Sequence, residues 1–243
     1  LKAFRVRKVF TAGRLIAEDG RVLIPLDDAA AGAPSHSIHL KPLAEDALSL
    51  PVRTGKARVI GIEPASLVTK SLVREVNTDD AGCFQSALNP GLTKIAVIER
   101  HKRTGKRGIG ILEGYGLTGG AIATTISHDS HNIVVAGDND PDMLLAVREL
   151  ADMGGGIVSV HGGAIRRLPL PIAGLMTSAD PQEVNAVLHD MLVAARAELG
   201  IPEDVEPFMT LSFMALPVIP ELKLTARGLF NVNTFSFVGV EAD

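Results

Sequence analysis

The sequence is poor in cysteine and aromatic residues and has no long uninterrupted apolar segment. Its 243 residues include one cysteine, one tyrosine and no tryptophan. The single cysteine, Cys83, excludes an internal disulfide and a cysteine-based zinc site, which is typical of a cytoplasmic protein. No apolar run approaches the roughly 20 residues that span a bilayer, and residues 1–7, LKAFRVR, contain no signal-peptide core. We therefore expect no membrane partner.

A strong excess of either charge is also missing. The formal net charge is −4, so no basic field favours nucleic acid as a partner, while 46% hydrophobic residues allow a sizeable core. The densest basic stretch, ERHKRTGKRG at residues 99–108, surrounds a Thr-Gly turn without aromatic residues. It fits a solvated hairpin tip better than a phosphate site, and it is a poor nucleic-acid signature.

The pattern of turn residues divides the chain into two expected domains. Residues 4–24 indicate short strands that break at Ala12-Gly13 and at the hairpin dipeptide Asp19-Gly20. A stretch rich in Ala, Pro, Ser and Asp follows, without sustained periodicity, to about Leu50. We expect one domain over residues 1–50, strands plus connection, and a second over residues 51–243.

The second domain mixes strands with two well-marked helices, which predicts an α+β class with helices on one face of a mixed sheet. Asp-Pro pairs start the helices, expected over 141–153 and 181–199, with Asp140 and Asp180 as caps. Short β-prone runs predict strands at 57–62, 94–99, 108–112, 121–126, 133–136, 157–160 and 211–216.

One short stretch, ISHDSHNIVVAG at residues 126–137, gathers polar side chains directly before an apolar strand. Its candidate site residues are His128, Asp129, Ser130, His131 and Asn132. Asp129 and Asn132 are able to close a loop by bonding its backbone, which is a purely structural role. The alternatives are a substrate-facing loop or a metal site, although the neighbouring sequence offers no obvious third ligand.

Five segments, in order, resemble one enzyme family. KIAVIERHKRTGKRGIG, GAIATTISHDSHNIVVAGDNDPDM, GGGIVSV, LPLPIAGLMT and PFMTLSFMALPVIPELKLT are similar to the C-terminal domain of bacterial and archaeal adenine deaminases of the amidohydrolase superfamily. The resemblance covers about residues 57–238. Upstream, VRKVFTAGRLIAEDGRVL is similar to the strands that follow the barrel in such enzymes and complete a small β-sandwich.

This resemblance implies a parent enzyme whose β/α barrel lies outside the given sequence. In the family, the barrel holds a divalent metal (manganese, iron or zinc) on a His-x-His pair and other ligands, and the enzyme converts adenine and water to hypoxanthine and ammonia. No His-x-His pair occurs in these residues, so we expect no metal ligand and no catalytic residue in this segment, and we expect the segment alone to be inactive. The family also implies a homodimer in purine salvage.

The resemblance favours a loop that lines or closes a purine pocket. Adenine carries no charge, so its recognition needs directional donors and acceptors such as those of residues 128–132. Arg100 and His101 are weaker members of the same set. Two alternatives remain: a non-catalytic purine-binding, regulatory or dimerisation domain, and a self-contained metal hydrolase built on His128, Asp129 and His131.

Overall fold

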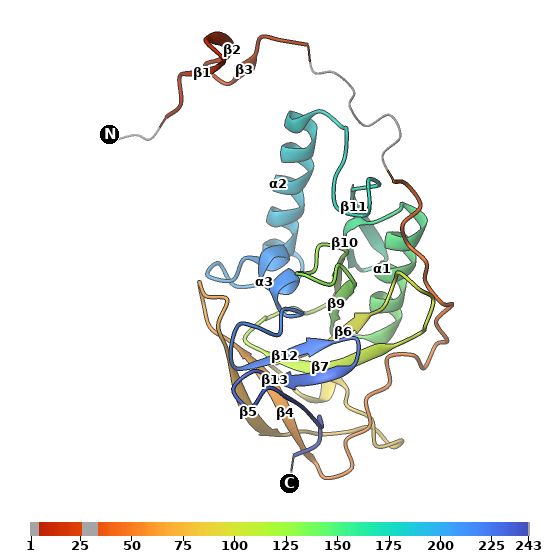
Figure 1. The fold of residues 1–243 in the computed structure, drawn as a ribbon. Helices are drawn as coiled ribbons and strands as arrows, with labels where there is room; N and C mark the ends of the chain where they lie inside the picture. Colours follow the sequence, from red (N-terminus) through yellow and green to blue (C-terminus); the bar gives the residue numbers. More distant parts are fainter. Residues whose placement is uncertain (1–4, 26–33, 243) are drawn as a thin grey trace. The chain divides into compact units, whose positions relative to one another are not determined.

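The chain divides between Gly32 and Ala33 into two compact units. Figure 1 shows their folds in a computed structural model, which describes residues 5–25 and 34–242. Phe4 of the first expected strand segment and residues 26–33 of the expected connection lie outside the described residues.

The first unit is a three-stranded antiparallel sheet, β1 (Lys8–Thr11), β2 (Arg14–Glu18) and β3 (Arg21–Val22). Its strands turn at Ala12-Gly13 and Asp19-Gly20, the two predicted positions. All four turn residues have positive φ, between 46° and 82°, the left-handed conformation of a type I′ hairpin turn. Every residue from 5 to 25 is exposed or half-buried, so this sheet encloses no core of its own.

The second unit is built on an eight-stranded sheet in the order β11-β10-β8-β9-β6-β7-β4-β5. Its strands are β4 (Lys56–Ile62), β5 (Thr69–Glu75), β6 (Leu92–Ile98), β7 (Arg107–Glu113), β8 (Gly120–Thr124), β9 (Ile133–Gly137), β10 (Gly156–His161) and β11 (Ala164–Pro169). A short 3₁₀ turn, η1 (Ser86–Leu88), precedes β6. The pair β4 and β7 is parallel and the other pairs are antiparallel, which makes the sheet mixed as predicted.

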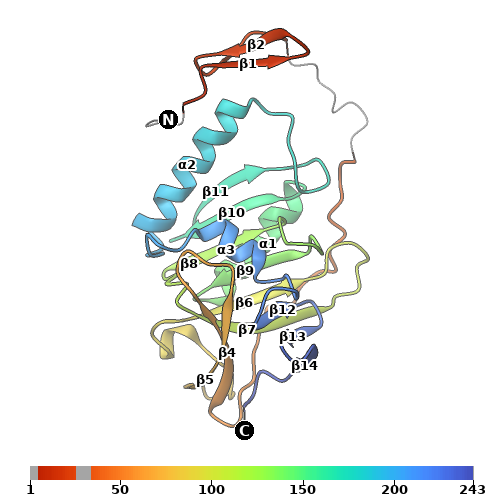
Figure 2. The ribbon, with the colours of Figure 1, turned by 60° about the vertical axis from the view of Figure 1, so that its left-hand side comes forward.

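Both faces of this sheet are covered, so the expectation of helices on one face is wrong (Figure 2). Helix α1 (Asp140–Asp152) covers one face; the other carries α2 (Pro181–Ala197), α3 (Pro207–Phe213) and a small sheet of β12 (Leu222–Thr225), β13 (Gly228–Asn231) and β14 (Ser236–Val238). The uninterrupted apolar strand β9 is the reason. Ile133 and Val135 pack toward α1, while Val134 and Ala136 pack toward α2 and α3. No helix in the described residues is long and apolar enough to cross a membrane.

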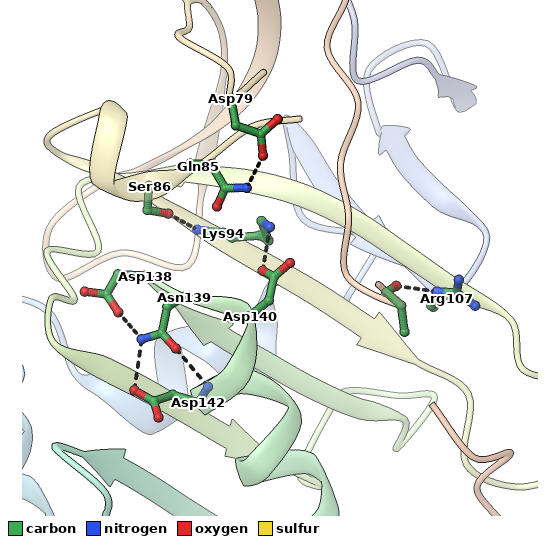
Figure 3. A network of polar contacts seen from close by, with 10 residues as sticks. Asp79, Gln85, Ser86, Lys94, Arg107, Asp138, Asn139, Asp140 and Asp142 are labelled. Atoms are coloured by element: carbon green, nitrogen blue, oxygen red, sulfur yellow. Dashed lines mark hydrogen bonds and ion pairs between the residues drawn. The ribbon is translucent and has the colours of Figure 1, made fainter. Parts of the chain in front are cut away.

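The start of α1 is fixed by a polar network between the helix and the sheet (Figure 3). Asn139, not the predicted Asp140, is the N-cap, because its side chain accepts from the Asp142 backbone amide. Asp140 instead forms an ion pair with the buried Lys94 of β6 at 2.5 Å. Asn139 also donates to Asp138. The helix therefore begins one residue before its expected start.

Helix α2 follows the prediction, with Asp180 accepting from the Gln182 amide at its N-terminus. The predicted strand at residues 211–216 is wrong, because this region belongs to helix α3 and the turn after it. The Glu206 carboxylate accepts from the Met209 amide, and the buried side chains of Phe208 and Leu211 lie three residues apart on the inner helix face.

The polypeptide from residue 34 onward belongs to the second unit, so the expected boundary near residue 50 differs from the observed division. Ala47 and Leu48 are buried in the α1-side core, and Ile38, Leu40 and Leu43 pack against it. Residues 34–50, called the strap below, lie on the α1-side core without forming a helix or strand over residues 34–44. Their apolar residues therefore show no helix or strand periodicity.

Candidate functional site

The polar stretch at residues 128–132 lies in the loop between β8 and β9. Helix α3 contacts this loop, because the His128 amide donates to the Ser212 carbonyl at 3.2 Å. The His128 ring also packs on Phe213, with 4.6 Å between ring centroids. Helix α3, part of whose segment was predicted to be a strand, therefore contacts the polar loop of residues 128–132 at His128.

The loop has an exposed tip and a buried base. The Asp129 side chain is 89% exposed and that of His128 is 39% exposed, whereas Ser127 and Asn132 are buried. Three buried side-chain atoms of the loop have no hydrogen-bond partner within the described residues: Ser127 Oγ, His131 Nδ1 and Asn132 Oδ1. Buried polar atoms are ordinarily paired, so three in one loop mark it as a place where hydrogen-bonding capacity is unused.

The two weaker candidates, Arg100 and His101, lie against this loop. They follow β6, and His101 Nε2 is 2.8 Å from the Ser130 carbonyl oxygen. Arg100 is buried and donates through Nε to the His131 carbonyl. Residues about 30 positions apart in sequence therefore contact each other, with Arg100 bonded to the loop backbone at His131 rather than placed at the exposed tip.

Glu99 organises the basic turn from which Arg100 and His101 extend. Its carboxylate accepts from the amides of His101, Lys102 and Thr104 and from the Thr104 hydroxyl. Burial raises the pKa of Glu99, but these hydrogen bonds outweigh it and lower the pKa to about 2. The basic stretch is thus a carboxylate-centred turn, consistent with the predicted hairpin tip.

His131 sits in surroundings that favour its neutral form. Burial lowers the pKa of its imidazole, and His128, Arg100 and His101 act in the same direction, while Asp129 opposes them. A neutral imidazole has one donor and one acceptor nitrogen. His131 is therefore suited to hydrogen bonding with an uncharged ring.

An apolar cavity of about 280 Å³ opens beside the loop. Its walls include His128 and Ile126 of the loop, Leu188 of α2, and Met209 and Phe213 of α3. Small-molecule sites commonly combine such apolar walls with a few polar groups. The loop thus contains buried polar atoms without a partner in the described residues, and its Ile126 and His128 line an apolar recess.

The arrangement does not resemble a metal centre. Within the described residues, no three His, Cys, Asp or Glu side chains are grouped so as to hold an ion. The rings of His128 and His131 are 6.2 Å apart between centroids, and Asp129 points largely to solvent. This geometry gives no support to a hydrolase built on these three residues alone.

Sequence reasoning missed three residues that shape the site: Thr125, Ser127 and Phe213. Thr125 and Ser127 are buried at the base of the loop, and Phe213 backs His128. The hydroxyl run TTIS directly before His128 was the available signal for the first two. Phe213 had no signal while its segment was interpreted as a strand.

Comparison with known proteins identifies the family. The model for the adenine deaminase C-terminal domain matches residues 66–236. Over 99% of its length the chain is 57% identical to an adenine deaminase of Nitratidesulfovibrio vulgaris and 45% identical to adenine deaminase 2 of Carboxydothermus hydrogenoformans; over 98% it is 41% identical to an adenine deaminase of Clostridium acetobutylicum. The chain spans about 42% of the length of each relative. It corresponds to their C-terminal portion, and it belongs to the adenine deaminase C-terminal domain family.

Proposed function

We propose that this chain is the C-terminal part of a metal-dependent adenine deaminase, a cytoplasmic, homodimeric enzyme that converts adenine and water to hypoxanthine and ammonia. In this proposal the loop of residues 128–132 lines or closes the substrate pocket of a preceding catalytic barrel. The observation that carries it is the unused hydrogen-bonding capacity of Ser127, His131 and Asn132 in a loop whose Ile126 and His128 line an apolar cavity, in a chain of this family.

The chemistry of the loop matches an uncharged purine. Adenine offers ring nitrogens as acceptors and an exocyclic amine as donor, so a complementary site needs both kinds of partner. A neutral His131 supplies one of each, Asn132 Oδ1 is an acceptor, and the Ser127 hydroxyl is both. The carboxylate of Asp129 at the exposed tip adds a further acceptor.

The divalent metal of the proposed enzyme is assigned to the barrel. The 6.2 Å between the ring centroids of His128 and His131 and the 89% exposure of the Asp129 side chain favour this assignment. The contribution of this chain is therefore binding and orientation of the purine and exclusion of water, and the activating chemistry is assigned elsewhere.

We also assign strands β1–β3 to a small β-sandwich completed by strands outside this chain. Val9, Phe10, Val22 and Leu23 are between 40% and 59% exposed, which is unusual for a sheet that folds by itself. Additional strands of the same polypeptide would bury these side chains.

The test is to express the open reading frame that contains this chain together with any coding sequence before it. The proposal predicts ammonia release from adenine by the longer protein, dependent on bound metal, and none by the 243-residue chain alone. Turnover and stoichiometric metal in the isolated chain would overturn it. Purine binding by the isolated chain, with no barrel encoded upstream, would instead favour a non-catalytic binding domain.

A further inference from the structure

Arg100 is a buried arginine whose partners are all neutral. Its side chain makes four hydrogen bonds, to the carbonyls of His131, Ser37 and Ala173 and to the Ser37 hydroxyl. No ion pair involves Arg100 within the described residues. Burying a guanidinium without a carboxylate partner costs folding free energy. A role in positioning other segments would explain why a charged residue occupies this place.

The four hydrogen bonds join three segments that are distant in sequence. They reach the site loop at His131, the strap at Ser37, and the turn after β11 at Ala173. The strap and the turn are also joined directly, because the Ala173 amide donates to the Pro34 carbonyl at 2.8 Å. Arg100 therefore connects the loop, the strap and the turn after β11 through its hydrogen bonds.

The same turn also holds the other end of the loop. Thr125, directly after β8, donates through its hydroxyl to the Gly174 carbonyl at 2.5 Å and accepts from the Gly156 amide at 2.8 Å. Gly174 lies against the guanidinium: a Cβ at this position would be 3.0 Å from its two terminal nitrogens. The turn at residues 171–174 thus contacts both anchors of the loop, Thr125 at its start and Arg100 near its end.

Charge adds to this geometry. Within residues 5–25 and 34–242 the guanidinium has no anionic partner, and it donates to the carbonyl of His131, whose other charged or titratable neighbours are His128, Asp129 and His101. Asp129 is the only acidic member of that group, and its side chain is 89% exposed. Burial is the main cause that lowers the pKa of His131, and the positive charge of Arg100 acts in the same direction.

From these contacts we propose that Arg100, together with the turn at residues 171–174, is a positioning clamp that fixes the loop of residues 128–132 for substrate recognition. The inference rests on the proposed function for its consequence in catalysis. The clamp itself belongs to this chain and is testable without any activity. Arg100 acts through His131 and does not touch the purine.

The first experiment uses the 243-residue chain and nuclear magnetic resonance. Arg100→Met removes hydrogen bonds and charge, Arg100→Lys keeps the charge but lacks the planar fork, and Arg103→Met, in the exposed part of the same turn, is the matched control. The pKa of His131 should rise by at least about half a unit in Arg100→Met and less in Arg100→Lys. Both variants should shift the amide signals of residues 126–132, and Arg103→Met should do neither.

A milder variant covers the case in which Arg100→Met does not fold. Ser37→Ala removes one of the four hydrogen bonds and should shift the same loop signals to a smaller extent. Unchanged loop signals and an unchanged His131 pKa in both Arg100 variants, or in Arg100→Lys and Ser37→Ala where Arg100→Met is unfolded, would overturn the clamp whatever the activity of the longer protein.

The second experiment uses the longer protein. The clamp predicts that Arg100→Lys lowers kcat/KM for adenine by about tenfold or more, and that Arg100→Met also moves the acidic limb of the pH profile upward, which a loss of stability alone does not do. A wild-type protein without deaminase activity would refute the proposed function and leave the clamp standing. Normal kcat/KM and pH profile in both variants, with a perturbed loop in the isolated chain, would refute the positioning role.

Discussion

The imidazole of His128 lies on the ring of Phe213, with centroids 4.6 Å apart and ring planes inclined by 33°. The contact joins the loop after β8 to a helix more than a third of the chain away in sequence. Because the His128 amide also donates to the Ser212 carbonyl, α3 fixes both the backbone and the side chain of this residue. The shape of the candidate site therefore depends on α3 as much as on the motif itself.

Replacing Phe213 should loosen the loop without unfolding the domain. Phe213→Ala removes the surface on which His128 rests, and because Phe213 is only half-buried we expect a loss of about 1–2 kcal/mol, less than for a fully buried phenylalanine. Amide exchange of residues 126–131 should accelerate more than that of α1. Phe213→Tyr keeps the ring and should leave exchange unchanged; equal acceleration in both variants would contradict the contact.

Thr125 should be important for stability through its hydroxyl alone. Thr125→Val keeps the shape but leaves the Gly156 amide and the Gly174 carbonyl without their buried partner. We expect the free energy of unfolding to fall by about 1–3 kcal/mol in urea denaturation. Thr124→Val is a comparison at the neighbouring buried threonine, whose hydroxyl accepts from the Ile126 amide. A Thr125→Val protein as stable as wild type would show that these hydrogen bonds contribute nothing net.

Lys223 on β12 should make stability depend on alkaline pH. Its ammonium is buried, donates to the Leu67 carbonyl at 2.9 Å, and has a pKa lowered by burial to about 8 from 10.5. Between these two values the unfolded chain binds more protons than the folded chain, so the free energy of unfolding should rise as pH increases from about 8 to 10.5.

Lys223→Met isolates this contribution from the other groups that titrate in the same range. Relative to the variant, wild type should gain about 3 kcal/mol across the window, and below pH 8 the difference should be constant. Urea denaturation at several pH values measures it. A difference that does not vary between pH 8 and 10.5 would show that the lysine titrates normally in the folded state.

The sequence predicted the elements whose local signals agree with their packing. The Asp-Pro starts located α1 and α2, and short β-branched runs located most central strands. Helix α3 was missed because its segment is apolar without obvious periodicity and because glutamate is an uncommon N-cap, although Glu206-Pro207 resembles the other two helix starts. Edge strands β5 and β11 were missed because their alternating, partly exposed residues resemble loops.

The candidate loop was visible in the sequence, but its anchoring was not. Five polar residues in a row identify residues 128–132, whereas nothing local connects Arg100 to Ser37 and Ala173. Those hydrogen bonds depend on tertiary structure, since the strap and the turn after β11 reach Arg100 from distant parts of the chain. Whether the loop contacts a purine remains a prediction that needs the longer protein.

The central claim is that the loop faces substrate, and His131→Ala in the longer protein tests it most directly. His131 is half-buried, and its Nδ1 has no hydrogen-bond partner in the part of the chain that the structure describes. Its truncation therefore removes little packing, and the melting temperature should change by no more than a few degrees. His189→Ala, at an exposed position of α2, is the matched control. We predict that His131→Ala lowers kcat/KM for adenine at least about tenfold while the control does not. A protein that loses stability but keeps kcat/KM per folded molecule would contradict a role in the substrate pocket.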